Sequence, residues 1–231
     1  EAGRHLGAGQ VEKRRGAGSG RARVSESDSR LTRRRKRRKR RRSMPLSPGE
    51  CEAMVTRAFQ DDKLSVLRAA IERHEGRAAA PEGCGRPLRI SCRDCRKDGV
   101  EGCARAFTEA EPMGVVLCTN RLESCHEVRE VLRHELTHAY DYCVAGLDLF
   151  KCTALAYSEV RAARDAECSS YKDFPSFLGW IERNCARRTA VSATRNLFPQ
   201  EGRDCVAQVF VDAHADQSPF ISSSSSSSSS S

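Results

Sequence analysis

The stretch R-E-V-L-R-H-E-L-T-H-A-Y-D-Y-C-V-A-G, at positions 129–146, constrains the fold of this chain more than any other feature. Its apolar residues recur at helical spacing and a glycine ends it, which predicts a helix over 123–146. Residues four positions apart lie on one face of a helix, so His134 and His138 can direct two imidazole nitrogens at one metal ion. Glu135 then lies beside that ion, in the position of a general base. The alternative is a chance match on a solvated helix surface.

A zinc ion with a catalytic role usually has three protein ligands and one open position. Three carboxylates downstream of His138 are candidates for the third ligand. We predict Glu159, because it lies on the next helical segment, which can pack beside the first. Asp148 follows a glycine turn and is the runner-up. Asp141 lies one turn further along the same helix, so we predict that it accepts a hydrogen bond from a ligand imidazole. The expected cofactor is one catalytic Zn²⁺.

Helix and strand signals surround this centre. Ser47-Pro48-Gly49-Glu50 has the pattern of a capping box, and an apolar stripe continues from it past 61–62 to a stop near position 76. Alternation over 88–92 and the apolar run 113–118 predict two strands with a cysteine-bearing loop between them. The run 113–118 is also a candidate edge for holding an extended peptide.

Helical patterns follow from position 148, near 176–188 and over 203–213. Two or three strands followed by helices predict an α+β fold of about one domain, mainly helical, with a small sheet packed on the H-E-x-x-H helix.

The two ends of the chain have a different composition. Residues 1–50 hold 17 Lys/Arg against 5 Asp/Glu and include the run R-R-R-K-R-R-K-R-R-R, and the chain closes on polyserine. Such segments cannot bury enough apolar surface to fold. We therefore expect disordered tails at 1–46 and 221–231 and a folded domain at 47–220. The basic run has three interpretations: a nuclear or nucleic-acid-binding arm, a mitochondrial targeting segment, or untranslated sequence before the first Met, Met44. Nucleic acid is expected as a partner only through this tail.

Two further observations limit the compartment. The sequence has no apolar run of about 18 residues, so no transmembrane helix is expected and any membrane association is peripheral. Twelve cysteines indicate an oxidising compartment or metal binding. Cys84, Cys92, Cys95 and Cys103 form the pattern C-x7-C-x2-C-x7-C and are our disulfide candidates, with a structural zinc site and free thiols as the alternatives.

Four blocks together resemble a known family. They are L-R-H-E-L-T-H-A-Y-D-Y-C, S-E-V-R-A-A at 158–163, C-A-R-R-T-A-V-S at 185–192 and D-Q-S-P-F at 216–220. In this order they are similar to the metalloprotease family of the mitochondrial inner membrane that acts in ATP synthase assembly, also called the Ku-binding protein family. The resemblance extends from about Cys51 to Phe220.

The resemblance implies a zincin-like metalloendopeptidase in the intermembrane space, peripheral to the inner membrane and disulfide-rich after folding by the oxidative import machinery. It implies that His134 and His138 bind zinc and that Glu135 is catalytic. The implied substrate is the precursor of ATP synthase subunit a (subunit 6), together with a role in assembling that subunit. A non-proteolytic assembly chaperone and a nuclear, Ku-associated DNA-repair partner are the alternatives. The chain has Tyr157 and Ala213-His214 where the family usually has cysteines, so the family's disulfide pairing does not carry over.

Overall fold

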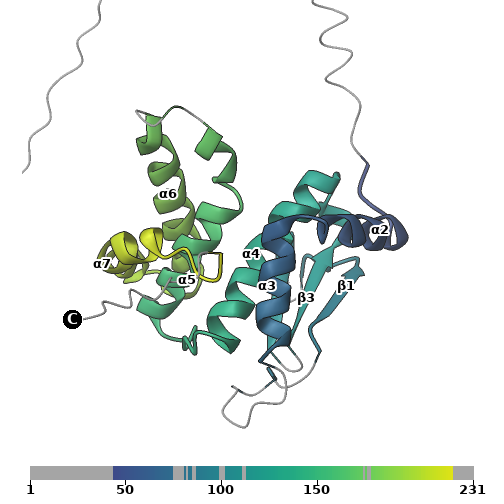
Figure 1. The fold of residues 1–231 in the computed structure, drawn as a ribbon, viewed down its shortest axis with the longest axis horizontal. Coiled ribbons are helices and arrows are strands. Elements are labelled where there is room, and N and C mark those ends of the chain that lie inside the picture. The colour runs from purple at the N-terminus through teal and green to yellow at the C-terminus, as the bar shows by residue number, and fades with distance from the viewer. Residues whose placement is uncertain are drawn as a thin grey trace, which may run out of the picture. The chain divides into compact units, whose positions relative to one another are not determined.

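The computed structural model describes residues 44–74, 81, 83–84, 87–98, 102–110, 113–173, 175 and 178–220. Most of the predicted tails, at 1–43 and 221–231, lie outside these residues. The described elements are α2 (Pro48–Ala58), α3 (Asp62–Glu72), β1 (Arg89–Arg93), β2 (Ala106–Ala110), β3 (Met113–Cys118), η1 (Thr119–Arg121), α4 (Cys125–Cys143), α5 (Cys152–Asp165), η2 (Ser169–Asp173), α6 (Gly179–Leu197) and α7 (Gly202–Ala215) (Figure 1). A mainly helical α+β fold with a small sheet is thereby confirmed.

The first helix begins at the predicted capping box. The Ser47 side chain accepts from the Glu50 backbone N–H, and the Glu50 carboxylate accepts from the Ser47 backbone N–H. The apolar stripe that follows is divided between two helices, because Asp61 ends the first segment and caps α3 through the N–H groups of Lys63 and Leu64. Leu46, which we assigned to the tail, is buried, and its N–H donates to the carbonyl of Leu122 at 3.0 Å.

The sheet has the strand order β1-β3-β2, with β1 parallel and β2 antiparallel to β3. All six residues of β3 are buried, as expected for a central strand covered on both faces. The sequence pattern missed β2, which lies in the predicted cysteine-bearing loop. That strand is only five residues long, so its local apolar signal is weak, and pairing with β3 is what makes it a strand.

Helix α4 lies at the centre of the first core cluster. It contacts α2, α3, β2 and β3, and also α5. Its apolar face, with Leu132 and Leu136 fully buried, packs in the same cluster as Val115 and Leu117 of β3. The histidines of α4 are therefore mounted on a helix that is fixed from several sides.

Helices α5, α6 and α7 form a second cluster. Their contact is made largely by small residues, including Ala156, Ala163, Ala186 and Ala190, which allow helix axes to approach closely. In Figure 1, α5 lies between α4 on one side and α6 and α7 on the other. One face of α5 is therefore available to complete a site with α4.

Five disulfides connect these elements. They join Cys51 to Cys92, Cys84 to Cys143, Cys95 to Cys118, Cys152 to Cys205 and Cys168 to Cys185. Three of our four disulfide candidates are paired, each with a cysteine outside the C-x7-C-x2-C-x7-C pattern, so the pattern is no structural zinc site. The fourth candidate, Cys103, is exposed and unpaired in the structure, which corrects our expectation for that residue.

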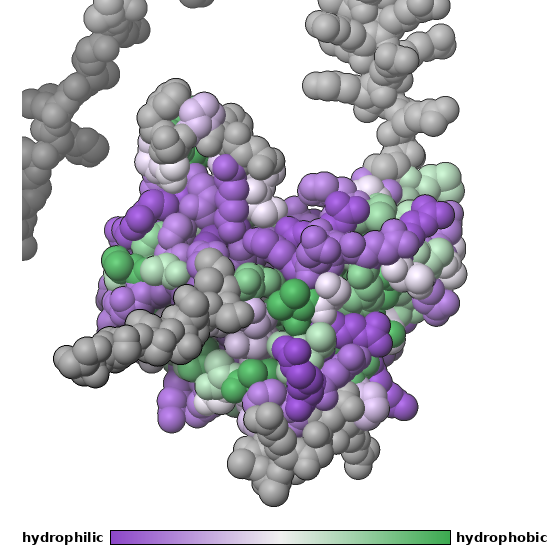
Figure 2. Space-filling model, in the orientation of Figure 1, coloured by the Kyte–Doolittle hydropathy of each residue, from purple (hydrophilic) through white to green (hydrophobic). Residues whose placement is uncertain are grey.

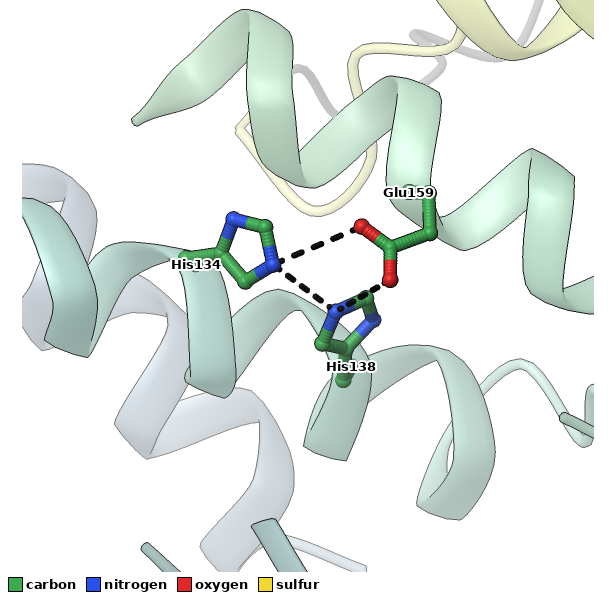
Figure 3. Close-up of side chains that lie close together, drawn as sticks. All are labelled: His134, His138 and Glu159. Carbon is green, nitrogen blue, oxygen red and sulfur yellow. Dashed lines mark hydrogen bonds and ion pairs between the residues drawn. The ribbon is translucent and has the colours of Figure 1, made fainter. Parts of the chain in front are cut away.

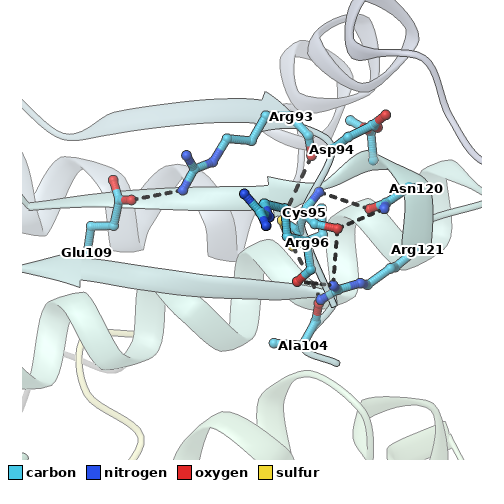
Figure 4. Close-up of a disulfide and its surroundings, with 10 residues drawn as sticks. Arg93, Asp94, Cys95, Arg96, Ala104, Glu109, Asn120 and Arg121 are labelled. Carbon is cyan, nitrogen blue, oxygen red and sulfur yellow. Dashed lines mark hydrogen bonds and ion pairs between the residues drawn. A yellow bond between two sulfur atoms is a disulfide. The ribbon is translucent and has the colours of Figure 1, made fainter. Parts of the chain in front are cut away.

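The Cys95 to Cys118 disulfide lies in a polar surround (Figure 4). Asn120 donates to the Cys95 carbonyl at 2.9 Å and accepts from the Cys95 N–H at 3.2 Å. The Arg121 guanidinium donates to the carbonyls of Cys95, Arg96 and Ala104. These bonds fix the loop after β1 against the end of β3.

Candidate metal centre

Helix α4 carries the H-E-x-x-H residues at a defined place in the fold. It begins at Ser124, whose side chain accepts from the Glu127 N–H, a cap that satisfies one of the free donors of the first turn. Nineteen residues then form a single helix through Cys143. His134 and His138 lie one turn apart on it, with ring centroids 4.8 Å from each other. Their shared face points toward α5.

Glu159 of α5 meets the two imidazoles (Figure 3). The Nε2 atoms of His134 and His138 are 3.1 Å apart. Glu159 places Oε2 3.5 Å from His134 Nε2 and Oε1 3.7 Å from His138 Nε2. Ligand atoms about 2.0–2.1 Å from a tetrahedral zinc ion lie about 3.4 Å from one another. The three side chains thus have the spacing of a three-ligand zinc site.

The chemistry of the donor set agrees with this geometry. Two imidazoles and a carboxylate are ligands that catalytic zinc uses. Glu159 is 7% exposed and its Oε2 is buried with no hydrogen-bond partner among the described residues, which is costly for a carboxylate oxygen unless a cation binds it. The residues present therefore fit a metal ion.

The Nδ1 atoms of the two histidines, on the side of each ring away from Glu159, each have a polar partner. His138 Nδ1 lies 2.7 Å from Ser158 Oγ, and His134 Nδ1 lies 3.2 Å from Glu167 Oε2. Such bonds to Nδ1 leave Nε2 free to bind a metal and fix the orientation of each ring. Sequence reasoning missed both Ser158 and Glu167. Ser158 directly precedes the predicted ligand Glu159, and that adjacency was the one available signal.

The charged side chains of the site shift the pKa of His134. Burial lowers the pKa of His134, but the neighbouring carboxylates of Glu159 and Glu167 outweigh it and raise this pKa well above its ordinary value. Burial raises the pKa of Glu159, and the two imidazoles lower it to a net value below the ordinary one. Because imidazole binds a metal in its neutral form, metal binding at these side chains is expected to weaken as pH falls.

We predicted that Asp141 accepts a hydrogen bond from a ligand imidazole, but the structure gives it a different partner. It is fully buried and accepts from Arg161 of α5. Burial raises its pKa, and Arg161 together with a hydrogen bond to Ser158 opposes that shift. Ser158, and not Asp141, is the hydrogen-bond partner of His138 Nδ1, while Asp141 accepts from Arg161.

Asp148, the runner-up for the third ligand, is outside the cluster. It is exposed in the turn between α4 and α5, where it pairs with Lys151 at 3.4 Å and accepts from the Phe150 N–H. Of these two candidate carboxylates, the structure brings only Glu159 to the histidines.

Glu135 points toward the sheet edge. It is 9% exposed, and Thr108 Oγ1 of β2 donates to its Oε2 at 2.9 Å. This contact corrects our expectation for the strand 113–118, because β3 is the central strand and is buried, and cannot hold a peptide at an edge. The edge next to Glu135 is β2.

Comparison with known proteins shows which protein family the chain resembles. Residues 49–221 match the model of the peptidase M76 family. A zebrafish (Danio rerio) protein named mitochondrial inner membrane protease ATP23 homolog is 32% identical over 139 residues, which cover 57% of this chain and 53% of the relative. The human protein of the same name is 28% identical over 179 residues, covering 74% and 69%. Mitochondrial inner membrane protease ATP23 of Candida albicans is 29% identical over 116 residues, covering 46% and 49%.

The chain spans about half to two thirds of the length of these curated relatives. No solved structure matches it. The family match includes all of α4 and α5, and with them every residue of the candidate metal centre. Because this match also covers most of the chain, the protein belongs to the peptidase M76 family.

Proposed function

We propose that this chain is a zincin-like, zinc-dependent metalloendopeptidase. The observation that carries the proposal is the cluster of His134, His138 and Glu159, which has metal-ligand spacing and whose histidines share α4 with Glu135. Membership of a peptidase family supports it. Bound there, a zinc ion would polarise the scissile carbonyl and lower the pKa of the attacking water.

The residues of the chain then have separate tasks. Glu135 accepts the proton of the attacking water and passes it to the leaving amine. Thr108 holds that carboxylate by a 2.9 Å hydrogen bond, so its position relative to β2 is fixed. Among the described strands, β2 pairs only with β3 and so keeps one edge free. An extended peptide bound along this edge by main-chain hydrogen bonds would place its scissile bond near Glu135.

The location and substrate are part of the same proposal. Relatives named as mitochondrial inner membrane proteases and five disulfides, which need an oxidising compartment, support a place in the intermembrane space. There the enzyme is peripheral to the inner membrane, processes the precursor of ATP synthase subunit a and assists the assembly of the membrane sector. No described helix is both long and apolar enough to cross a bilayer.

The test separates chemistry from metal binding. Glu135→Gln should abolish cleavage of the subunit a precursor while zinc stays bound, because Glu135 is not among the three ligand side chains. Glu159→Gln should lower the zinc content and the activity together. Glu130→Gln is the matched control, since Glu130 lies on the same helix and pairs with Arg105. Unchanged cleavage by Glu135→Gln would refute the proposed mechanism.

A complementation arm addresses the assembly role. Cells that lack the endogenous protein receive the wild-type chain or Glu135→Gln, and precursor maturation and ATP synthase assembly are measured separately. We expect maturation to fail in the variant. Normal maturation with that variant would show that this chain does not cleave the precursor. Restored assembly without maturation would show that the assembly role does not need the catalytic residue.

A further inference from the structure

The outer face of α6, on the side of the second cluster away from α4, carries an arginine groove. Its residues Glu182, Ala186, Ala190 and Thr194 form the inner, buried face of that helix. The opposite face is exposed and, with the start of α7, encloses a groove of about 640 Å³ lined by Arg187, Arg188, Val191, Ser192, Arg195, Asn196 and Arg203. We call this set the arginine groove.

The side chains that line the groove carry a net positive charge. Four arginines line it and no carboxylate does, and among the described residues none of the four forms an ion pair. Holding four like charges close together is unfavourable unless an anion shares the site. Arginine presents a planar fork of donors suited to phosphate oxygens, and Ser192 and Asn196 add neutral donors between them.

The packing of α7 on α6 builds this site. Gly202, the first residue of α7, lies so close to Arg195 that a Cβ there would be 3.0 Å from the arginine Cγ and from its backbone nitrogen. This approach brings Arg203 of α7 beside the arginines of α6. The positive end of the α7 dipole also faces the same region.

A tryptophan on the same face identifies the kind of anion. Trp180 is 61% exposed, and it lines an adjoining pocket together with Arg188, which both pockets share. Trp180, Arg187, Arg188, Val191 and Arg195 recur at helical spacing on one side of α6. Figure 2 shows hydrophilic residues with apolar side chains among them over the part of the surface that α6 and α7 occupy. Tryptophan is favoured at the level of the lipid headgroups, and arginine is attracted to anionic ones.

We infer that the arginine groove and Trp180 form a docking surface for a membrane of anionic phospholipid, with lipid phosphates in the groove and the indole in the interface. The inference adds a binding surface to the membrane location in the proposed function. Because α5 lies between α4 and α6, the groove and the candidate metal centre lie on different helices of the fold.

Vesicle flotation tests this surface in the full chain. The background chain carries glutamine at positions 33–42, because the cations of that run bind anionic membranes by themselves. The probes are phosphatidylcholine vesicles with and without phosphatidylglycerol. We expect binding only to the anionic vesicles, and we expect Arg188→Gln with Arg195→Gln to weaken it about 25-fold, at about fivefold per arginine. Trp180→Ala should weaken it several-fold.

Two exposed arginines outside the groove provide the matched control. Arg57→Gln with Arg89→Gln removes the same charge from α2 and β1, and we expect it to bind within about twofold of the background. An equal loss in both double variants would overturn the inference, because it would show diffuse attraction. Equal binding to neutral vesicles would also overturn it. So would groove-dependent binding of inorganic phosphate without binding of vesicles, which would indicate a soluble anion.

Zinc content and cleavage of a soluble peptide, measured on the same variants, separate this inference from the proposed function. We expect both to be unchanged in the groove variants. A chain that floats with anionic vesicles but cuts nothing would remove the peptidase and leave the docking surface. A chain that cleaves the peptide normally but never floats with vesicles would overturn the docking surface and leave the peptidase.

Discussion

At the residue scale, Ser158 decides how His138 faces the candidate metal centre. Its hydroxyl lies 2.7 Å from His138 Nδ1, and Asp141 and Arg161 stand behind it. This chain of contacts fixes the ring so that Nε2 points at His134 and Glu159. Ligand geometry here depends on residues that do not bind the metal themselves.

We expect Ser158→Ala to lower zinc affinity about 10- to 100-fold, because His138 loses the bond that sets its tautomer and orientation. Competition with a chelator measures this on the purified chain. Ser192→Ala, on the outer face of α6, is the control and should bind zinc as wild type does. Equal affinity in the Ser158 and Ser192 variants would show that Ser158 does not orient the ligand.

Asp165 gives a prediction for stability against pH. Its side chain is 1% exposed and is surrounded by Arg164, Lys63 and Lys172. Burial raises its pKa, but the bonds to Arg164 and Lys172 lower it far below its ordinary value. The ionised form is therefore favoured in the folded state, and its contribution is present above the unfolded pKa and lost as pH falls through the folded one.

We expect Asp165→Asn to lower the free energy of unfolding by about 3 kcal/mol near neutral pH, since it leaves the buried Arg164 and two partly exposed lysines without a charged partner. The gap to wild type should shrink as pH falls below about 4. Urea unfolding over a pH series measures both. A gap that stays constant down to the lowest pH would contradict the assigned role of the carboxylate.

At the element scale, Asp61 joins two helices. It caps α3 by accepting from Lys63 and Leu64 N–H groups, and its other oxygen accepts from Arg133 of α4 at 2.8 Å. Arg133 also donates to the Asp165 carbonyl at the end of α5. Asp61, which separates α2 from α3, thus also anchors α4, the helix that carries His134 and His138.

We expect Asp61→Ala to destabilise the fold by about 2 kcal/mol, from the lost cap and the lost partner of Arg133. Asp61→Asn keeps the cap and should recover about half of this loss. Asp62→Ala changes the exposed neighbouring carboxylate and should cost only a few tenths of a kcal/mol. Thermal unfolding compares the three variants, and similar losses at positions 61 and 62 would exclude the joining role.

At the scale of the whole molecule, disulfides connect segments far apart in the sequence. The Cys84 to Cys143 bond spans 59 residues and ties the end of α4 to the segment before β1. The Cys152 to Cys205 bond joins α5 to α7. In the chain-entropy model a closed loop of this length stabilises the fold by about 4 kcal/mol.

We expect the native chain, denatured without reductant, to show two free thiols, from Cys103 and Cys125, and twelve after reduction. Thiol titration measures both numbers. Because the disulfides hold α4 and α5 in their places, we also expect reduction to lower zinc retention and the unfolding temperature together. Twelve free thiols in native protein would refute the oxidised fold.

The sequence by itself determined what depends on neighbours along the chain. The capping box at Ser47, the helix that carries His134 and His138 and the helix that carries Glu159 follow from local spacing, because capping and helix faces repeat over three or four residues. Our choice of Glu159 over Asp148 also came from the sequence, but it needed the assumption that the two helices pack side by side.

Only the tertiary structure decided what depends on segments that meet in space. It placed Ser158 and Glu167 behind the histidines, paired Cys84 with Cys143, and made β2 the free edge beside Glu135. It also brought Arg203 to the arginines of α6 through the close approach at Gly202. Packing between distant segments sets the strand order, the disulfide pairing and the hydrogen-bond partner of each histidine Nδ1, and no local pattern encodes them.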